Sequence, residues 1–212
     1  MFINNSLKEF IDVVASDNPT PGGGSVSALA GSLGGALTNM VGTLTIGKKV
    51  WEDIPEDAKS EMEKSFKEMQ EKINSLSKIV DEDSTAFDGV MQAFKMPKET
   101  DEDKKARSNA IQEGYKHALE VPLRCAEECY RVLELQEVFA NHGNVNAITD
   151  VGVGTLLAYT GLEGALFNVT INLISVKDPE YKKAIEGRVS ALLKDGKRLK
   201  ERLIDKVYER LG

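Results

Sequence analysis

The stretch from Met62 to Phe94 constrains the fold of this chain more than any other. Ten of its positions follow one another at alternating intervals of four and three residues: Met62, Phe66, Met69, Ile73, Leu76, Val80, Asp83, Phe87, Val90 and Phe94. Nine of the ten are apolar, and the residues between them are mostly charged. This spacing is typical of a helix that packs along one face. We therefore predict a long helix here that ends at Pro97.

Asp83 is the one polar residue on this face. Burial disfavours the charged form of a carboxylate, so its pKa rises unless hydrogen bonds or cations compensate. A carboxyl group with a raised pKa can exchange protons near neutral pH, which makes Asp83 a candidate catalytic residue. The alternative is a structural carboxylate that a nearby helix end or arginine satisfies, and the pattern alone leaves both open.

Composition favours an ordinary globular protein, with one domain over residues 1–212. Of the 212 residues, 41% are hydrophobic and 29% are charged, enough to bury a core. The net charge is −7 and no block of lysine and arginine is interleaved with aromatics, so we expect no nucleic-acid partner. Cys125 and Cys129 are four apart on an expected helix, where reduced core thiols are favoured over a disulfide. His117 and His142 lack further soft ligands, so no metal site is predicted.

Neither the N-terminal residues nor the most apolar stretch predicts a secreted or membrane protein. The first ten residues lack the basic segment and apolar run of a secretory signal, so we expect a cytoplasmic location. The most apolar stretch, residues 151–176, contains Glu163 and several glycines and asparagines. It predicts a buried central helix with no membrane contact.

The remaining periodicity predicts helices over residues 5–16, 25–49, 101–141, 147–176 and 178–210. Ser25 is the expected N-cap of the second helix. Pro122 interrupts residues 101–141, which form either two helices or one kinked helix. No strand alternation and no internal repeat is present. The predicted fold class is all-α, a multi-helix up-and-down bundle with long central helices.

Two segments rich in small residues could carry a ligand. Gly22, Gly23 and Gly24 run into a helix N-terminus, whose free N–H groups suit an anion, although they could equally form a flexible turn. On the helix after them, one narrow face holds Ser25, Ser32, Ala36, Asn39 and Thr43. A neighbouring backbone or a ligand could approach this face closely.

The later glycine-rich helix has a second face of this kind. It holds Asp150, Gly154, Leu157, Gly161, Gly164, Asn168 and Asn172. The two interpretations are close helix packing through glycine, with amides bonded across the contact, and a groove for a flat hydrogen-bonding ligand.

Basic residues gather near expected helix ends in this acidic chain. They are Lys48, Lys49, Lys95, Lys98, Lys104, Lys105 and Arg107. Such runs are usually solvated faces, but they would form an anion-steering rim if these ends converge.

Six motifs in order along the chain resemble the cyclodeaminase family. They are Pro19-Thr-Pro-Gly-Gly-Gly-Ser25, the Val80-Asp-Glu-Asp83 run before Ala86-Phe87, Met96-Pro-Lys98, Gly143-Asn144, Asp150 and residues 167–173, Phe-Asn-Val-Thr-Ile-Asn-Leu. The chain is similar to the C-terminal half of formiminotransferase-cyclodeaminase. This resemblance implies a homodimeric all-α enzyme of one-carbon metabolism and histidine degradation, with no metal or redox cofactor. It would convert 5-formiminotetrahydrofolate to 5,10-methenyltetrahydrofolate and ammonia.

The resemblance also implies roles for individual residues. Asp83, the second Asp of the Asp-x-Asp run, corresponds to the catalytic residue of the family. The expected substrate-binding residues are Gly22, Gly23, Gly24, Ser25, Asn39, Lys48, Lys49, Asn144, Asp150, Asn168 and Asn172. Asp150 and the two last asparagines would orient the pterin, while the glycine segment and the lysines would hold the glutamate tail of a tetrahydrofolate polyglutamate.

Two other functions stay open from the sequence. Sister proteins with the same domain resemble methenyltetrahydrofolate cyclohydrolases, which hydrolyse the ring that a cyclodeaminase closes. A non-catalytic subunit that binds folate polyglutamate is the third reading. A transferase half has no counterpart in these residues, so a separate formiminotransferase is an expected partner for the cyclodeaminase reading.

Overall fold

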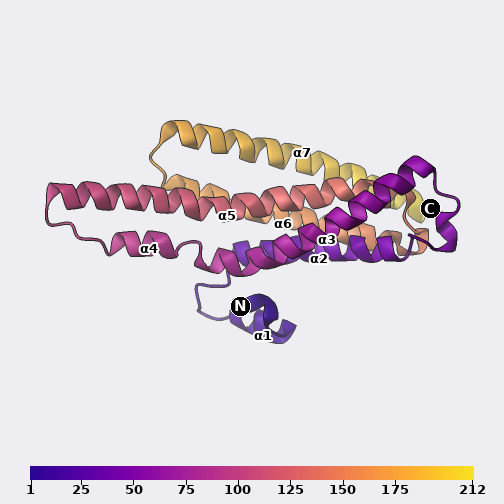
Figure 1. Ribbon diagram of the computed structural model, residues 1–212, viewed down its shortest axis with the longest axis horizontal. Coiled ribbons are helices and arrows are strands. Elements are labelled where there is room, and N and C mark those ends of the chain that lie inside the picture. Colours follow the sequence, from indigo (N-terminus) through magenta and orange to yellow (C-terminus); the bar gives the residue numbers. More distant parts are fainter.

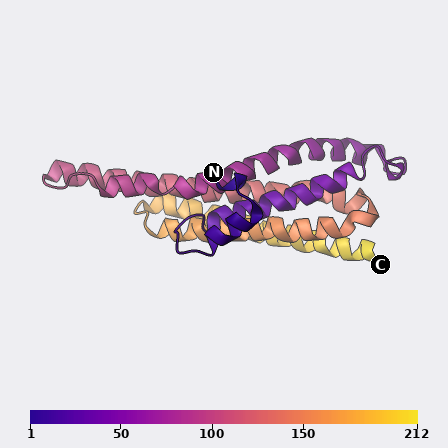
Figure 2. The same ribbon diagram turned by 90° about the horizontal axis from the view of Figure 1, so that it is seen from below.

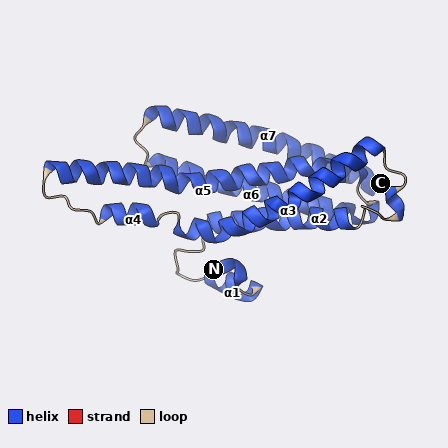
Figure 3. Ribbon diagram, viewed as in Figure 1, coloured by secondary structure: helices blue, strands red, loops and turns tan.

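A computed structural model describes all 212 residues, and its secondary structure is helical throughout (Figure 3). The α-helices are α1 (Leu7–Val14), α2 (Gly23–Thr43), α3 (Glu56–Thr85), α4 (Asp88–Phe94), α5 (Asp101–His142), α6 (Ile148–Ile174) and α7 (Pro179–Leu211). Short 3-10 turns precede α1 (Phe2–Asn4) and lie between α2 and α3 (Lys49–Trp51) and between α5 and α6 (Val145–Ala147). The all-α prediction is confirmed.

The helices form an elongated bundle around α5, which runs along its whole length (Figure 1). The helix pairs α2 and α6, α5 and α6, and α2 and α3 pack against each other, and α7 covers α5 and α6. At one end α4 lies beside the N-terminal part of α5, while α1 lies on the outside of the bundle (Figures 1 and 2), with Phe10 buried against the core. No helix combines the length and hydropathy needed to cross a bilayer.

The apolar face from Met62 onward forms part of the core, but the predicted helix is shorter than expected. Met62, Met69, Leu76 and Val80 are fully buried. However, α3 ends at Thr85, and the chain turns before α4, so the prediction of one helix continuing to Pro97 is wrong. The hydroxyls of two consecutive residues at the end of α3, Ser84 and Thr85, donate to backbone carbonyls three residues back. Such local bonds compete with the helical hydrogen-bond ladder.

Two other sequence expectations need correction. Helix α2 begins at Gly23 and ends at Thr43, and Gly22 occupies the N-cap position without a capping side chain. Ser25 is therefore not the N-cap, because it lies inside the first turn, where its hydroxyl bonds to α3. Of the two interpretations of residues 101–141, one helix is correct, since α5 continues through Pro122.

Glycines let α2 and α6 pack with their backbones almost in contact. A Cβ added to Gly154 would lie 2.8 Å from the carbonyl oxygen of Gly34, and one added to Gly161 would lie 2.7 Å from that of Ser27. The fully buried Gln136 side chain joins the same region, because its amide donates to Thr38 Oγ1 at 2.9 Å and its carbonyl accepts from Thr155 Oγ1 at 3.0 Å. Close packing of α2 against α6 is therefore the correct interpretation for the middle of the α6 glycine face.

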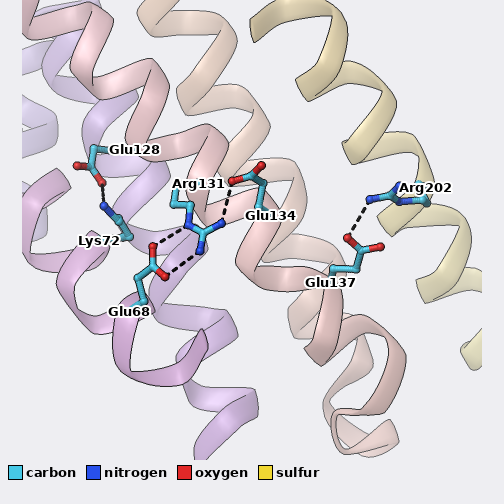
Figure 4. A network of polar contacts seen from close by, with 7 residues as sticks. All are labelled: Glu68, Lys72, Glu128, Arg131, Glu134, Glu137 and Arg202. Atoms are coloured by element: carbon cyan, nitrogen blue, oxygen red, sulfur yellow. Dashed lines mark hydrogen bonds and ion pairs between the residues drawn. The ribbon is translucent and has the colours of Figure 1, made fainter. Parts of the chain in front are cut away.

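Ion pairs tie α3, α5 and α7 together along one side of the bundle (Figure 4). Arg131 on α5 binds Glu68 on α3 through two parallel bonds, of 2.6 and 2.8 Å. Arg202 on α7 binds Glu137 on α5 at 2.9 Å. The paired side chains are partly exposed, so each pair contributes modestly to stability.

Replacing Gly154 by alanine tests the close α2–α6 contact. The added methyl meets backbone on the facing helix, which cannot move as a side-chain tip does. We expect Gly154→Ala to destabilise the protein by roughly 1–3 kcal/mol in urea unfolding. The matched control is Gly187→Ala on α7, where an added Cβ meets nothing within 4 Å and the stability should stay unchanged or increase.

Candidate active site

Asp83 lies near the C-terminal end of α3, and its carboxylate faces the first turn of α2. The hydroxyl of Ser25 donates a hydrogen bond of 3.1 Å to Asp83 Oδ2. A Cβ added to Gly24 would come within 2.6 Å of both carboxylate oxygens, closer than real Cβ atoms approach other atoms. The sequence thus places glycine where the carboxylate needs the space.

The environment of Asp83 raises the pKa of its carboxyl group above the ordinary value. Partial burial is the main cause, and hydrogen bonds from the hydroxyl and the backbone N–H of Ser25 act in the opposite direction. The side chain is only partly buried, so it remains accessible from outside. A raised pKa and partial exposure are both properties that favour a role in proton transfer.

The glycine segment packs against the Asp83 carboxylate, so the N-terminus of α2 is not left free for another anion. Because Gly22 has no side chain to cap α2, the N–H groups of the first turn have no partner on their own helix. Asp83 supplies a negative charge at this end of the helix dipole. The hydrogen bond of Asp83 to a helix end, which the structural alternative predicts, is thus observed. The Asp83 side chain is nevertheless partly exposed, so this bond does not exclude a catalytic role.

The two asparagines of α6 lie at the same end of the bundle. The amide nitrogen of Asn168 would be 3.4 Å from a Cβ added to Gly23, and it donates to the carbonyl of Gly164 at 2.9 Å. One turn further, Asn172 donates to the carbonyl of Ala118 on α5 at 3.3 Å. The structure therefore gathers Gly22, Gly23, Gly24, Ser25, Asp83 and Asn168 around the N-terminus of α2, with Asn172 one turn further along α6.

The other predicted site residues lie toward the opposite end of α2. Lys48 and Lys49 follow this helix, and Asn144 donates to the carbonyl of Leu44 at 3.1 Å. Asp150 stands in the first turn of α6, at this same end. Helix α2 separates the two ends by about 30 Å, from its rise of 1.5 Å per residue. Asn39 lies between them, with its amide donating to Gln70 at 3.5 Å.

One chain therefore does not assemble all the predicted site residues around Asp83. The predicted lysine rim is divided in the same way. Lys48 and Lys49 lie at one end, and the basic residues between α4 and α5 and in the first turns of α5 lie at the other. The face from Asp150 to Asn172 is also no continuous groove, because α2 covers its middle. Asp83, the glycine segment and the two asparagines remain as the candidate active site of a single chain.

No three His, Cys, Asp or Glu side chains lie close enough together to hold a metal ion. Cys125 and Cys129 are free and buried in the core, as predicted. The polar groups observed at the site are a carboxyl group, a neighbouring hydroxyl and side-chain amides.

The chain is similar to known proteins of one family. Residues 6–191 match the family model described as formiminotransferase-cyclodeaminase. The methenyltetrahydrofolate cyclohydrolase of Methylorubrum extorquens is 39% identical over 209 residues, which cover 99% of both chains. The formimidoyltransferase-cyclodeaminase of Mus musculus is 34% identical over 195 residues, which are 92% of this chain and 35% of that protein.

A solved structure shows the same fold. The formiminotetrahydrofolate cyclodeaminase of Thermotoga maritima superimposes with a TM-score of 0.77 at 29% identity, covering 98% of this chain and 96% of that one. Both the family match and the full-length relatives lead to one conclusion. This chain belongs to the formiminotransferase-cyclodeaminase family of folate-metabolising enzymes.

Proposed function

We propose that this protein is a methenyltetrahydrofolate cyclohydrolase in which Asp83 acts as the proton-transferring group. The sequence expectation ranked the cyclodeaminase reaction first. The end-to-end match to the Methylorubrum extorquens cyclohydrolase, at 39% identity, favours hydrolysis instead. The observation that carries a catalytic role is the accessible carboxyl group of Asp83, whose pKa burial raises.

Hydrolysis needs a base and then an acid at the same carbon. The Asp83 carboxylate accepts a proton from a water molecule as the water oxygen bonds to the methenyl carbon, which gives a tetrahedral centre. The bond from this carbon to N5 then breaks, N5 takes up the proton held by Asp83, and the hydroxyl of the tetrahedral centre loses its proton, so that a formyl group remains on N10 and one proton is released overall. A positioned carboxyl group that serves both steps typically contributes about 10² to 10⁴ in rate.

The cyclodeaminase reaction is the second candidate, supported by the Thermotoga maritima relative. There N10 would attack the formimino carbon and give its proton to Asp83. The carboxyl group would pass that proton to the amino group, which leaves as ammonia. In both reactions Asn168 would orient the pterin, since its amide lies against Gly23 in the first turn of α2, and Asn172 would act one turn further along α6.

One assay with both substrates separates the candidates. A cyclohydrolase consumes added 5,10-methenyltetrahydrofolate, so the methenyl absorbance falls faster than without enzyme. A cyclodeaminase generates that absorbance from 5-formiminotetrahydrofolate and releases ammonia. Tight folate binding with turnover of neither substrate would overturn both and leave the non-catalytic binding subunit.

We also propose that the protein forms a homodimer through the outer face of α2 and α6. No charged residue occurs between Asp17 and Lys48, and α6 carries only Asp150 and Glu163. Large apolar side chains are exposed along this face: Val26, Leu33, Met40 and Leu44 on α2, and Val153, Leu156, Phe167, Ile171 and Ile174 on α6. A patch of this extent usually marks a protein interface.

A two-fold axis through the middle of this face would make the two α2 helices antiparallel. The end of one copy that carries Lys48, Asn144 and Asp150 would then approach the Asp83 end of the other copy. This arrangement would unite the two groups of predicted site residues that one chain keeps about 30 Å apart.

Introducing a charge on this face tests the dimer. We expect light scattering to give a dimer for the wild type and a monomer for Leu33→Glu, with turnover lost together with the dimer. The control Tyr208→Glu changes an exposed apolar-ring side chain on α7, outside this face, and should stay dimeric and active. A wild-type monomer with full turnover would contradict both the dimer and the shared site.

A further inference from the structure

A basic cavity lies between α4, α5 and the C-terminal end of α6. Its volume is about 400 Å³, and its walls include Lys98, Lys104, Arg107 and Lys177 but no acidic side chain. Phe94 and Tyr115 give it two aromatic walls. In a chain of net charge −7, such a local concentration of cations favours an anionic ligand.

Most of this positive charge is not neutralised by the protein. Lys104 pairs with Asp101 at 2.9 Å. Arg107 instead donates to the neutral carbonyl of Phe94, at 3.1 and 3.3 Å, and the side chains of Lys98 and Lys177 make no ion pair. Three cations are therefore available to a ligand.

Hydrogen bonds hold the walls of the cavity in place. The side chain of Gln112 donates to the carbonyl of Ser175 at 3.2 Å and accepts from the N–H of Lys177 at 2.7 Å, so it fixes the end of α6 against α5. Arg107 fixes the end of α4 against α5 through its bonds to Phe94. The cavity is thus part of the folded framework, with little ordering needed on binding.

Two paths along the protein lead from Asp83 to this cavity. On one, Phe87 follows Asp83 by four residues, in the turn after α3, and packs edge-on against Tyr115, with ring centroids 5.9 Å apart. On the other, the polar face of α6 runs from Asn168 to Ser175, about 10 Å further along the helix axis. A ligand that reacts at Asp83 could extend along α6 into the cavity.

We propose that this cavity binds carboxylates of the glutamate tail of the folate substrate. The inference rests on the proposed function, which makes a folate the ligand at Asp83. The tail is flexible and carries negative charge, which complements the three available cations. The two aromatic walls suit the aminobenzoyl group that precedes the tail. The cavity replaces the glycine segment as the tail site, since Asp83 already faces those glycines.

The test compares mono- and triglutamate forms of the folate that the enzyme turns over. Lys98→Gln with Lys177→Gln removes two charges that support no other contact. We expect this variant to raise KM for the triglutamate by about 5- to 20-fold, with little change for the monoglutamate and in kcat. The control, Lys194→Gln with Lys197→Gln, makes the same charge change on exposed positions of α7 and should keep the wild-type ratio.

Direct binding of tri-γ-glutamate, measured calorimetrically, keeps this inference separate from the proposed function. Weaker binding by the Lys98 and Lys177 variant than by the control supports the cavity even if neither folate is turned over. Absence of wild-type binding, or equal binding by the variant, overturns it. Normal turnover of the monoglutamate with an unchanged KM ratio would overturn the tail site while leaving the proposed function intact.

Discussion

Asp83→Asn should reduce turnover by about 10² or more while the protein still folds and binds folate. Asparagine keeps the size of the side chain and can still accept the hydrogen bond from Ser25, which is 3.1 Å long in the structure. It cannot accept and release a proton. Folate affinity, melting temperature and turnover should be measured on one preparation.

The stability of this variant separates a catalytic from a purely structural carboxylate. Because burial raises the folded-state pKa of Asp83 above its unfolded value, protonation of this group stabilises the fold at low pH. That contribution is complete below the unfolded pKa of about 4 and is lost as the pH rises through the folded pKa. At neutral pH the asparagine variant should be at least as stable as the wild type, with the difference shrinking in acid.

The pH dependence of turnover gives an independent readout. A general base must be ionised, so the wild-type rate should fall on the acid side as the pH drops through the raised pKa of Asp83. The acid limb should be absent in Asp83→Asn. A folded asparagine variant with near wild-type turnover would remove Asp83 from the mechanism.

The fold could be predicted from the sequence because apolar periodicity is strong along most of the chain. The spacing from Met62 to Val80 predicts a helix face, and these side chains are buried. The end of this helix was not predictable from spacing, because Phe87, Val90 and Phe94 continue the same pattern. The chain turns at Ser84 and Thr85 through local side-chain bonds, which a periodicity argument does not contain.

The candidate site was predictable only in part. Asp83 was identified because a polar residue interrupts an apolar pattern, and this signal depends on one helix alone. Whether Asp150 and Lys48 lie near it depends on how helices pair, and within one chain they lie at the other end of α2. Lys177 and Tyr115 were missed because ordinary lysines and tyrosines on helices carry no signal until the fold brings them to one cavity.

Glycine at position 24 should be as necessary for activity as the carboxylate that it faces. In Gly24→Ala, the added methyl would overlap the Asp83 carboxylate, which is the flexible end of a side chain and can rotate away. The carboxylate then moves by about 1 Å or more and loses its bond to Ser25, and a misplacement of this size can reduce turnover by about 10².

The effect of Gly24→Ala on stability should be small, in contrast to its effect on turnover. Alanine favours helix over glycine, and the methyl meets a movable side chain, unlike Gly154→Ala, where it meets backbone. Urea unfolding and turnover should be compared with Gly187→Ala, which makes the same substitution in open space. If Gly24→Ala folds normally and keeps full turnover, the position of the Asp83 carboxylate against α2 has no part in catalysis. If it loses turnover at wild-type stability, the close approach of α2 to Asp83 is a requirement of the reaction and not of the fold.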